Sequence, residues 1–150
     1  AWVTVPLQTE AAALSIAAHF GEAIILNGAT VPEQTVSAGA ELPFTLYWQA
    51  VQPPDFDYAV FAHLLDANGE KVAQLDWQPH DAIGLLPATA WIVGQPVVDT
   101  QALALPPTLT PGEYQLVVGL YNWQDGQRVP VTGADADQND VVRIAHILVQ

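Results

Sequence analysis

The stretch that decides the fold is PGEYQLVVGLY, residues 111–121. It opens with Pro-Gly, a pair typical of tight turns, and continues through Tyr114 into residues that favour strands. A run of this composition directly after a turn predicts a strand from Tyr114 to Tyr121. The rest of the chain repeats the same arrangement, with strand-like segments separated by turns rich in Pro and Gly.

Two further segments show what kind of strands these are. Residues 42–49 alternate apolar and polar side chains, the period of a half-buried strand, whereas residues 58–65 are apolar on both faces apart from His63 and predict a central strand. Asn68-Gly69 and Asp125-Gly126 predict hairpins. The remaining expected strands are Leu14–Phe20, Ala23–Leu26, Val72–Leu75, Val97–Leu105, Arg128–Val131 and Val141–Val149.

About nine strands with turns roughly every 8–12 residues predict an all-β fold, a two-sheet antiparallel sandwich with immunoglobulin-like or jelly-roll connections. A length of 150 residues fits one such domain over 1–150. The Pro-Gly-Glu-Tyr motif at 111–114 resembles the tyrosine corner of immunoglobulin-like sandwiches. Trp48 is expected in the core, and the segment 79–96 is expected to be a long ordered loop whose Trp91 covers that core.

The charge balance excludes several classes of partner. Three Lys and Arg stand against sixteen Asp and Glu, for a formal net charge of -13. Lys71, Arg128 and Arg143 are too few and too scattered along the chain for binding nucleic acid or an anionic membrane surface. The absence of Cys excludes thiolate metal sites and cysteine nucleophiles.

A wider pattern resembles a known family. The motifs that carry it are Phe61-Ala62-His63-Leu64-Leu65-Asp66 followed by Gly69, then Val118-Gly119-Leu120-Tyr121 and Arg128-Val129-Pro130-Val131. They look like the β-sandwich domain at the C-terminal, extracytoplasmic end of multi-pass bacterial membrane proteins similar to mannosyltransferase-type glycosyltransferases. The resemblance runs from about Phe20 to the end of the chain. It implies architecture and location only, because the catalytic acids of that family belong to its membrane part, which is absent here.

This resemblance leads to an expected function. The chain is expected to be a non-catalytic accessory or interaction domain of a larger bacterial cell-surface or membrane protein, and not an enzyme. It is expected outside the cytoplasmic membrane, tethered through hydrophobic spans upstream of Ala1, with Ala1–Gln8 as an extended lead-in. The expected partner is a cell-envelope glycan or another part of the parent protein.

Two alternatives come from other functional classes. A carbohydrate-binding module would stack sugar rings on aromatic side chains near strand ends, and Trp77 and Trp123 are the candidates. A small glycosidase or esterase needs a catalytic group, and Asp66 and Asp76 could face each other across the Asn68-Gly69 hairpin as a carboxylate pair. The plainer interpretation places both carboxylates in water, with Asp66 capping the turn.

Two polar features remain. The acidic loop 135–140 alternates oxygen ligands, so Asp135, Asp137 and Asp140 are the candidates for Ca²⁺, although the loop lacks the closing Glu and central Gly of an EF-hand. Otherwise no cofactor is expected. His63 is expected to be a buried structural histidine that donates to a backbone carbonyl or to Asp66.

Overall fold

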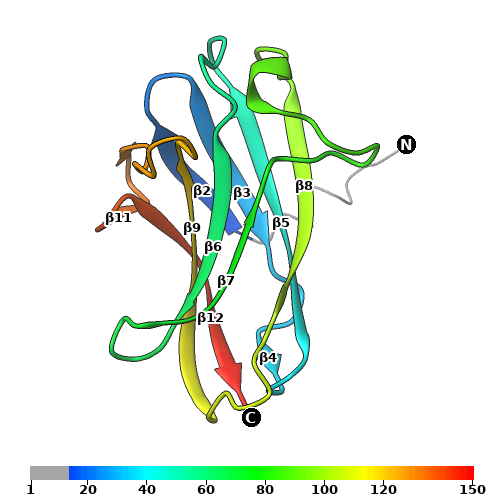
Figure 1. Ribbon diagram of the computed structural model, residues 1–150, viewed down its shortest axis with the longest axis vertical. Coiled ribbons are helices and arrows are strands. Elements are labelled where there is room, and N and C mark those ends of the chain that lie inside the picture. Colours follow the sequence, from blue (N-terminus) through cyan, green and yellow to red (C-terminus); the bar gives the residue numbers. More distant parts are fainter. Residues whose placement is uncertain (1–13) are drawn as a thin grey trace.

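The computed structural model describes residues 14–150, which form two antiparallel sheets packed face to face (Figure 1). The first sheet has five strands in the order β10-β2-β3-β5-β8, with bounds Val131–Thr132, Leu14–Phe20, Ile24–Thr30, Glu41–Ala50 and Pro96–Ala104. The second has six, and five of them follow the order β11-β12-β9-β6-β7, with bounds Ala136–Asp137, Val141–Val149, Gly112–Tyr121, Ala59–Leu65 and Lys71–Trp77. Its sixth strand, β4 (Thr35–Val36), pairs in parallel with β12. The expected lead-in Ala1–Gln8 lies outside the described residues.

The all-β sandwich prediction is confirmed, and the strand order is that of immunoglobulin-like sandwiches. In that fold the second and fifth strands are neighbours in one sheet, and the third, sixth and seventh form the other. The main strands here, counted from one to seven, are β3, β5, β6, β7, β8, β9 and β12. The second (β5) pairs with the fifth (β8), and the sixth (β9) lies between the third (β6) and the seventh (β12). The jelly-roll alternative is therefore wrong, and residues 14–150 form eleven strands where about nine were predicted.

Most strand predictions are confirmed. Leu14–Phe20 and Val141–Val149 have the predicted bounds. The Asn68-Gly69 turn joins β6 to β7, with Gly69 at a φ of 79°, where a side chain would be strained. The Asp125-Gly126 turn also reverses the chain, but its second arm makes one bridge to β9 and then crosses over, so β10 pairs with β2 of the other sheet.

The core fills the space between the sheets and is capped by a loop. Trp48 is fully buried and meets Phe20 edge to face at 5.2 Å between ring centroids. In the loop between β7 and β8, a short 3₁₀ turn (Ala88–Ala90) leads into Trp91, which is 5% exposed and lies 6.2 Å from Trp48. The expectations for Trp48 and Trp91 are confirmed.

The tyrosine corner is confirmed as well. Tyr114 is buried at the start of β9, and its hydroxyl donates to the carbonyl oxygen of Thr110 at 2.6 Å. This bond ties the strand to the crossover from the other sheet. It lies at the opposite end of the sandwich from the loops described next.

Candidate functional site

Four connections meet at one end of the sandwich: residues 21–23, 51–58, 78–95 and 122–130 (upper part of Figure 1). This loop end carries six of the nine large apolar side chains that are exposed among the described residues: Val51, Ile83, Leu85, Ile92, Val93 and Trp123. Ile83 is 96% exposed. Exposed apolar side chains gathered in one place mark interaction surfaces more often than scattered ones do.

Asp57 holds three of these loops together. Its carboxylate accepts from the backbone N–H and the hydroxyl of Thr89, at 2.9 and 2.6 Å. Its backbone carbonyl accepts from Trp123 Nε1 at 2.8 Å and from Gln78 Nε2 at 3.3 Å. One residue therefore fixes the loops that follow β5, β7 and β9 relative to one another. Nothing in the sequence around Asp57 indicated this role.

Trp123 belongs to a small aromatic cluster at this end. Its ring centroid lies 5.4 Å from that of Phe56, and Phe56 also meets Tyr58 edge to face at 5.2 Å. The side chain of Trp123 is 51% exposed although its indole N–H is bonded. Burial and the neighbouring Asp55 carboxylate, which accepts from the phenol, raise the pKa of Tyr58 above its usual value. Trp123 thus exposes an aromatic ring to solvent while its hydrogen bond to Asp57 and its contact with Phe56 fix its position.

Trp77 lies in a different setting from Trp123. It ends β7, packs edge to face on Phe44 at 5.7 Å, and donates from Nε1 to Asp99 Oδ2 at 2.7 Å. Asp99 is on β8 in the other sheet and is fully buried, with a second bond from Gln101 Nε2 at 3.0 Å. Trp77 therefore links the two sheets, and the structure does not place it beside Trp123 as a sugar platform.

The acidic loop uses its carboxylates internally. Asp135 Oδ2 accepts from Ala17 N at 2.7 Å, Asp137 Oδ1 accepts from Gln138 N at 2.7 Å, and Asp140 Oδ1 accepts from Val131 N at 3.1 Å. Within residues 14–150 no three His, Cys, Asp or Glu side chains gather closely enough to hold a metal ion. The loop thus fastens β2 and β10 to its own turn, and the calcium site stays a prediction that this geometry does not favour.

The proposed carboxylate pair is not formed. Asp66 caps its turn by accepting from Asn68 N at 2.8 Å and Glu70 N at 2.9 Å. Asp76 pairs with Phe61 in the ladder between β6 and β7. Phe61 lies five residues before Asp66 along the chain, which is roughly 17 Å at the rise of a strand. A glycosidase pair is separated by about 5–9.5 Å. The pairing of these two residues is therefore wrong, and the turn-capping interpretation of Asp66 is confirmed.

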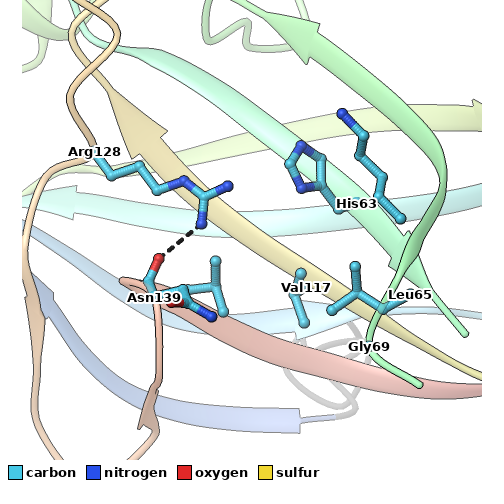
Figure 2. A pocket seen from close by; sticks show the side chains of 8 residues that line it. His63, Leu65, Gly69, Val117, Arg128 and Asn139 are labelled. Atoms are coloured by element: carbon cyan, nitrogen blue, oxygen red, sulfur yellow. Dashed lines mark hydrogen bonds between the residues drawn. The ribbon is translucent and has the colours of Figure 1, made fainter. Parts of the chain in front are cut away.

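A pocket that the sequence did not indicate lies on the outer face of the six-stranded sheet (Figure 2). It has a volume of about 260 Å³, and its lining residues are His63, Leu65, Gly69, Lys71, Val117, Arg128, Asn139 and Val141. Figure 2 shows Arg128 and His63 on opposite sides of the pocket, with Val117 and Leu65 below them. Lys71 and Arg128, two of the three Lys and Arg residues that were predicted to be scattered, therefore line the same pocket.

His63 faces this pocket instead of the core. Its ring lies 4.6 Å from Phe61, and no hydrogen bond joins it to Asp66 or to a backbone carbonyl in the described part of the chain. Burial, followed by the charges of Lys71 and Arg128, lowers the pKa of His63 from 6.5 to about 4, against a smaller opposing effect of Asp76. The expectation of a buried donor is wrong because β6 is apolar on both faces, so its sequence did not reveal which face was inside.

Comparisons with known proteins do not identify a family for this chain. No protein-family model matches the chain, and no curated protein matches it. Among solved structures, the chain is similar to the CARDB domain of a Pyrococcus furiosus protein, determined in complex with di-metal ions. The identity is 11%, the TM-score is 0.41, and the match covers 85% of this chain and 94% of that one. None of the three comparisons links the chain to glycosyltransferase-like membrane proteins, so that resemblance stays a prediction.

None of the helical segments in 14–150 has the length and the hydropathy to cross a bilayer.

Proposed function

We propose that this chain is a non-catalytic interaction domain of a larger bacterial surface protein, and that it meets its ligand with the loop end that carries Trp123. The observation that carries the proposal is the loop end itself, where Asp57 fixes three loops and six large apolar side chains stay exposed. Holding apolar groups in water is unfavourable, and a partner that covers them recovers about 25 cal/mol per Å² of apolar surface.

A second candidate is carbohydrate binding at the same place. It is favoured by the exposed ring of Trp123 beside Phe56 and Tyr58, since sugar rings stack on aromatic faces. Of the two tryptophans predicted for this role, Trp123 is exposed, whereas Trp77 is partly buried and bonded to Asp99.

A glycan array with matched variants tests the surface. Trp123→Ala removes the exposed ring, and Leu148→Ala removes an apolar side chain that is 42% exposed on β12, near the opposite end. If the loop end is a glycan site, Trp123→Ala abolishes binding while Leu148→Ala leaves it unchanged. Equal loss in both variants, or binding that survives Trp123→Ala, would contradict the carbohydrate candidate.

The complete open reading frame tests the location. We expect hydrophobic spans of about 20 residues upstream of Ala1 and a domain outside the cytoplasmic membrane. A reading frame with neither spans nor a signal peptide would contradict the location and the accessory role together.

A further inference from the structure

The pocket on the outer sheet face holds two cations in a molecule that is otherwise strongly acidic. Lys71 begins β7, and Arg128 lies in the connection from β9 to β10. The formal charge of the chain is -13, so each cation is outnumbered about fivefold by carboxylates. In such a chain a basic side chain is expected to pair with an acidic one. These two do not.

The partners of both cations are uncharged. Lys71 Nζ donates to Gln74 Oε1, and Arg128 Nη1 donates to the carbonyl oxygen of Asn139 at 2.8 Å. Throughout residues 14–150 no carboxylate forms an ion pair with either side chain. Because a guanidinium has five N–H donors, Arg128 keeps donors for a further acceptor.

The apolar side chains that line the pocket are Leu65, Val117 and Val141, and two of them belong to a separate cluster. Phe61, Val117 and Val141 form a buried cluster of their own on this outer face, separate from the main core. The guanidinium of Arg128 lies 4.5 Å above the ring of Phe61. That ring lies across Gly119, where an added Cβ would be 2.3 Å from Phe61 Cζ. Apolar side chains beside two cations strengthen the attraction of the cations for an anion, because fewer water molecules screen it.

The net charge and the volume of the pocket limit the class of ligand that it can bind. The charged groups around His63 are Lys71 and Asp76 from β7 and Arg128 from the β9–β10 connection, while β9 contributes the uncharged Val117. Together these groups carry one net positive charge, which a carboxylate balances and a phosphate, near -2 at neutral pH, exceeds. A volume of about 260 Å³ is below the roughly 300–1,000 Å³ of drug-sized sites and suits a single ring.

We propose that this pocket binds a carboxylate carried on a single ring, with the carboxylate held by Lys71 and Arg128 and the ring against Leu65, Val117 and Val141. A small aromatic acid and a uronic acid unit of a glycan share this chemistry. Arg128 comes from the connection 122–130, but none of the six exposed apolar side chains of the loop end lines the pocket, so the proposal stands independently of the function proposed above.

Titration of the 150-residue chain followed by NMR tests the proposal. The probes are benzoate and D-glucuronate, each with its neutral counterpart, benzamide and D-glucose, at constant ionic strength set with NaCl. We expect saturable shifts at His63 and Val117 with at least one carboxylate, and binding at least about tenfold weaker with its neutral counterpart. The bound anion offsets the two cations, so the pKa of His63 rises from about 4. The carboxylate that binds more tightly identifies the source.

Charge variants locate the site. Lys71→Gln and Arg128→Gln are each expected to weaken binding about tenfold or more. Arg143→Gln is the matched control, because Arg143 is the third cation and lines separate hollows beside Asp135; binding should change less than about twofold. Since Arg128 also packs on Phe61, Lys71→Gln carries the test if Arg128→Gln unfolds. Equal weakening by Arg143→Gln, equal binding of the neutral probes, or no saturation beyond the effect of NaCl would overturn the proposal.

Discussion

The charged side chain buried between the two sheets and those on the outer face of the six-stranded sheet differ in their hydrogen-bond partners. Between the sheets, the buried carboxylate of Asp99 accepts hydrogen bonds from Trp77 and Gln101. On the outer face, Lys71 and Arg128 find only neutral acceptors. A buried charged group needs hydrogen-bond partners for the fold to form. A charged group at the surface is hydrated by water until a ligand displaces that water. The first kind of polar group therefore stabilises the fold, and the second is available for binding.

The largest expected effect comes from breaking the inner link. Asp99→Ala leaves the indole N–H of Trp77 and the amide of Gln101 without their acceptor in a buried setting, so we expect the free energy of unfolding to fall by about 3 kcal/mol. Urea denaturation followed by Trp fluorescence measures it. Thr100→Ala, at an exposed neighbour in β8, should cost less than about 1 kcal/mol. Similar losses for both variants would mean that Asp99 does not link the sheets.

The second effect disturbs the buried cluster on the outer face. Gly119→Ala places a methyl group 2.3 Å from the ring of Phe61, so the ring must move from under Arg128; we expect a loss of about 2 kcal/mol. The double variant Gly119→Ala with Phe61→Leu has room for the methyl group. It should therefore lose less stability than the sum of the two single variants. Strict additivity in this double-mutant cycle would show that the two residues do not contact each other in solution.

A smaller effect is expected at the tyrosine corner. Tyr114→Phe removes the bond to the carbonyl of Thr110 but leaves the ring packed, so the cost should be on the order of 1 kcal/mol. The denaturation midpoint in urea reports the change. A midpoint equal to that of the unmodified chain would indicate a hydroxyl that prefers solvent.

The smallest effect sharpens the description of the outer face and depends on pH. Folding lowers the pKa of His63 from 6.5 to about 4, so between these values the unfolded chain binds the proton more tightly than the folded chain. Stability from this group is therefore present above pH 6.5 and is lost as the pH falls to about 4. Solvent screening keeps the loss below about 1 kcal/mol.

The measurement for His63 is the difference between two variants. The free energy of unfolding at pH 7 minus that at pH 4.5 should be larger in the unmodified chain than in His63→Gln, because the carboxylates contribute equally to both. Identical differences would mean that His63 titrates near its ordinary pKa and that neither burial nor the charges of Lys71 and Arg128 shift it.

The sequence predicted the architecture because the signals for it are local. Alternation over residues 42–49 identified β5, and the turn at Asn68-Gly69 identified the β6–β7 hairpin. Tyr114 predicted the corner since its partner, Thr110, is four residues away. Each of these features depends on residues that are neighbours along the chain.

The site residues depend on contacts that are distant along the chain. Trp77 and Asp99 lie on strands of different sheets, so composition did not reveal that Trp77 would be committed to the core. Lys71 and Arg128 meet only because β7 and the β9–β10 connection flank the same sheet face. The acidic loop looked like a set of metal ligands. Its carboxylates instead accept from the backbone N–H groups of Ala17 and Val131, which lie in strands of the other sheet.

The unequal lengths of the edge strands affect whether molecules pair edge to edge in concentrated solution. β10 and β11 have two residues each, so they cover parts of β2 and β12 without offering a long row of free backbone groups. The longer edge β7 carries Lys71 and Asp76, and β8 begins with Pro96. Charge, proline and short edges all discourage the addition of a strand from a second molecule. Concentrated solutions of this sandwich should therefore resist fibril formation by edge-to-edge pairing.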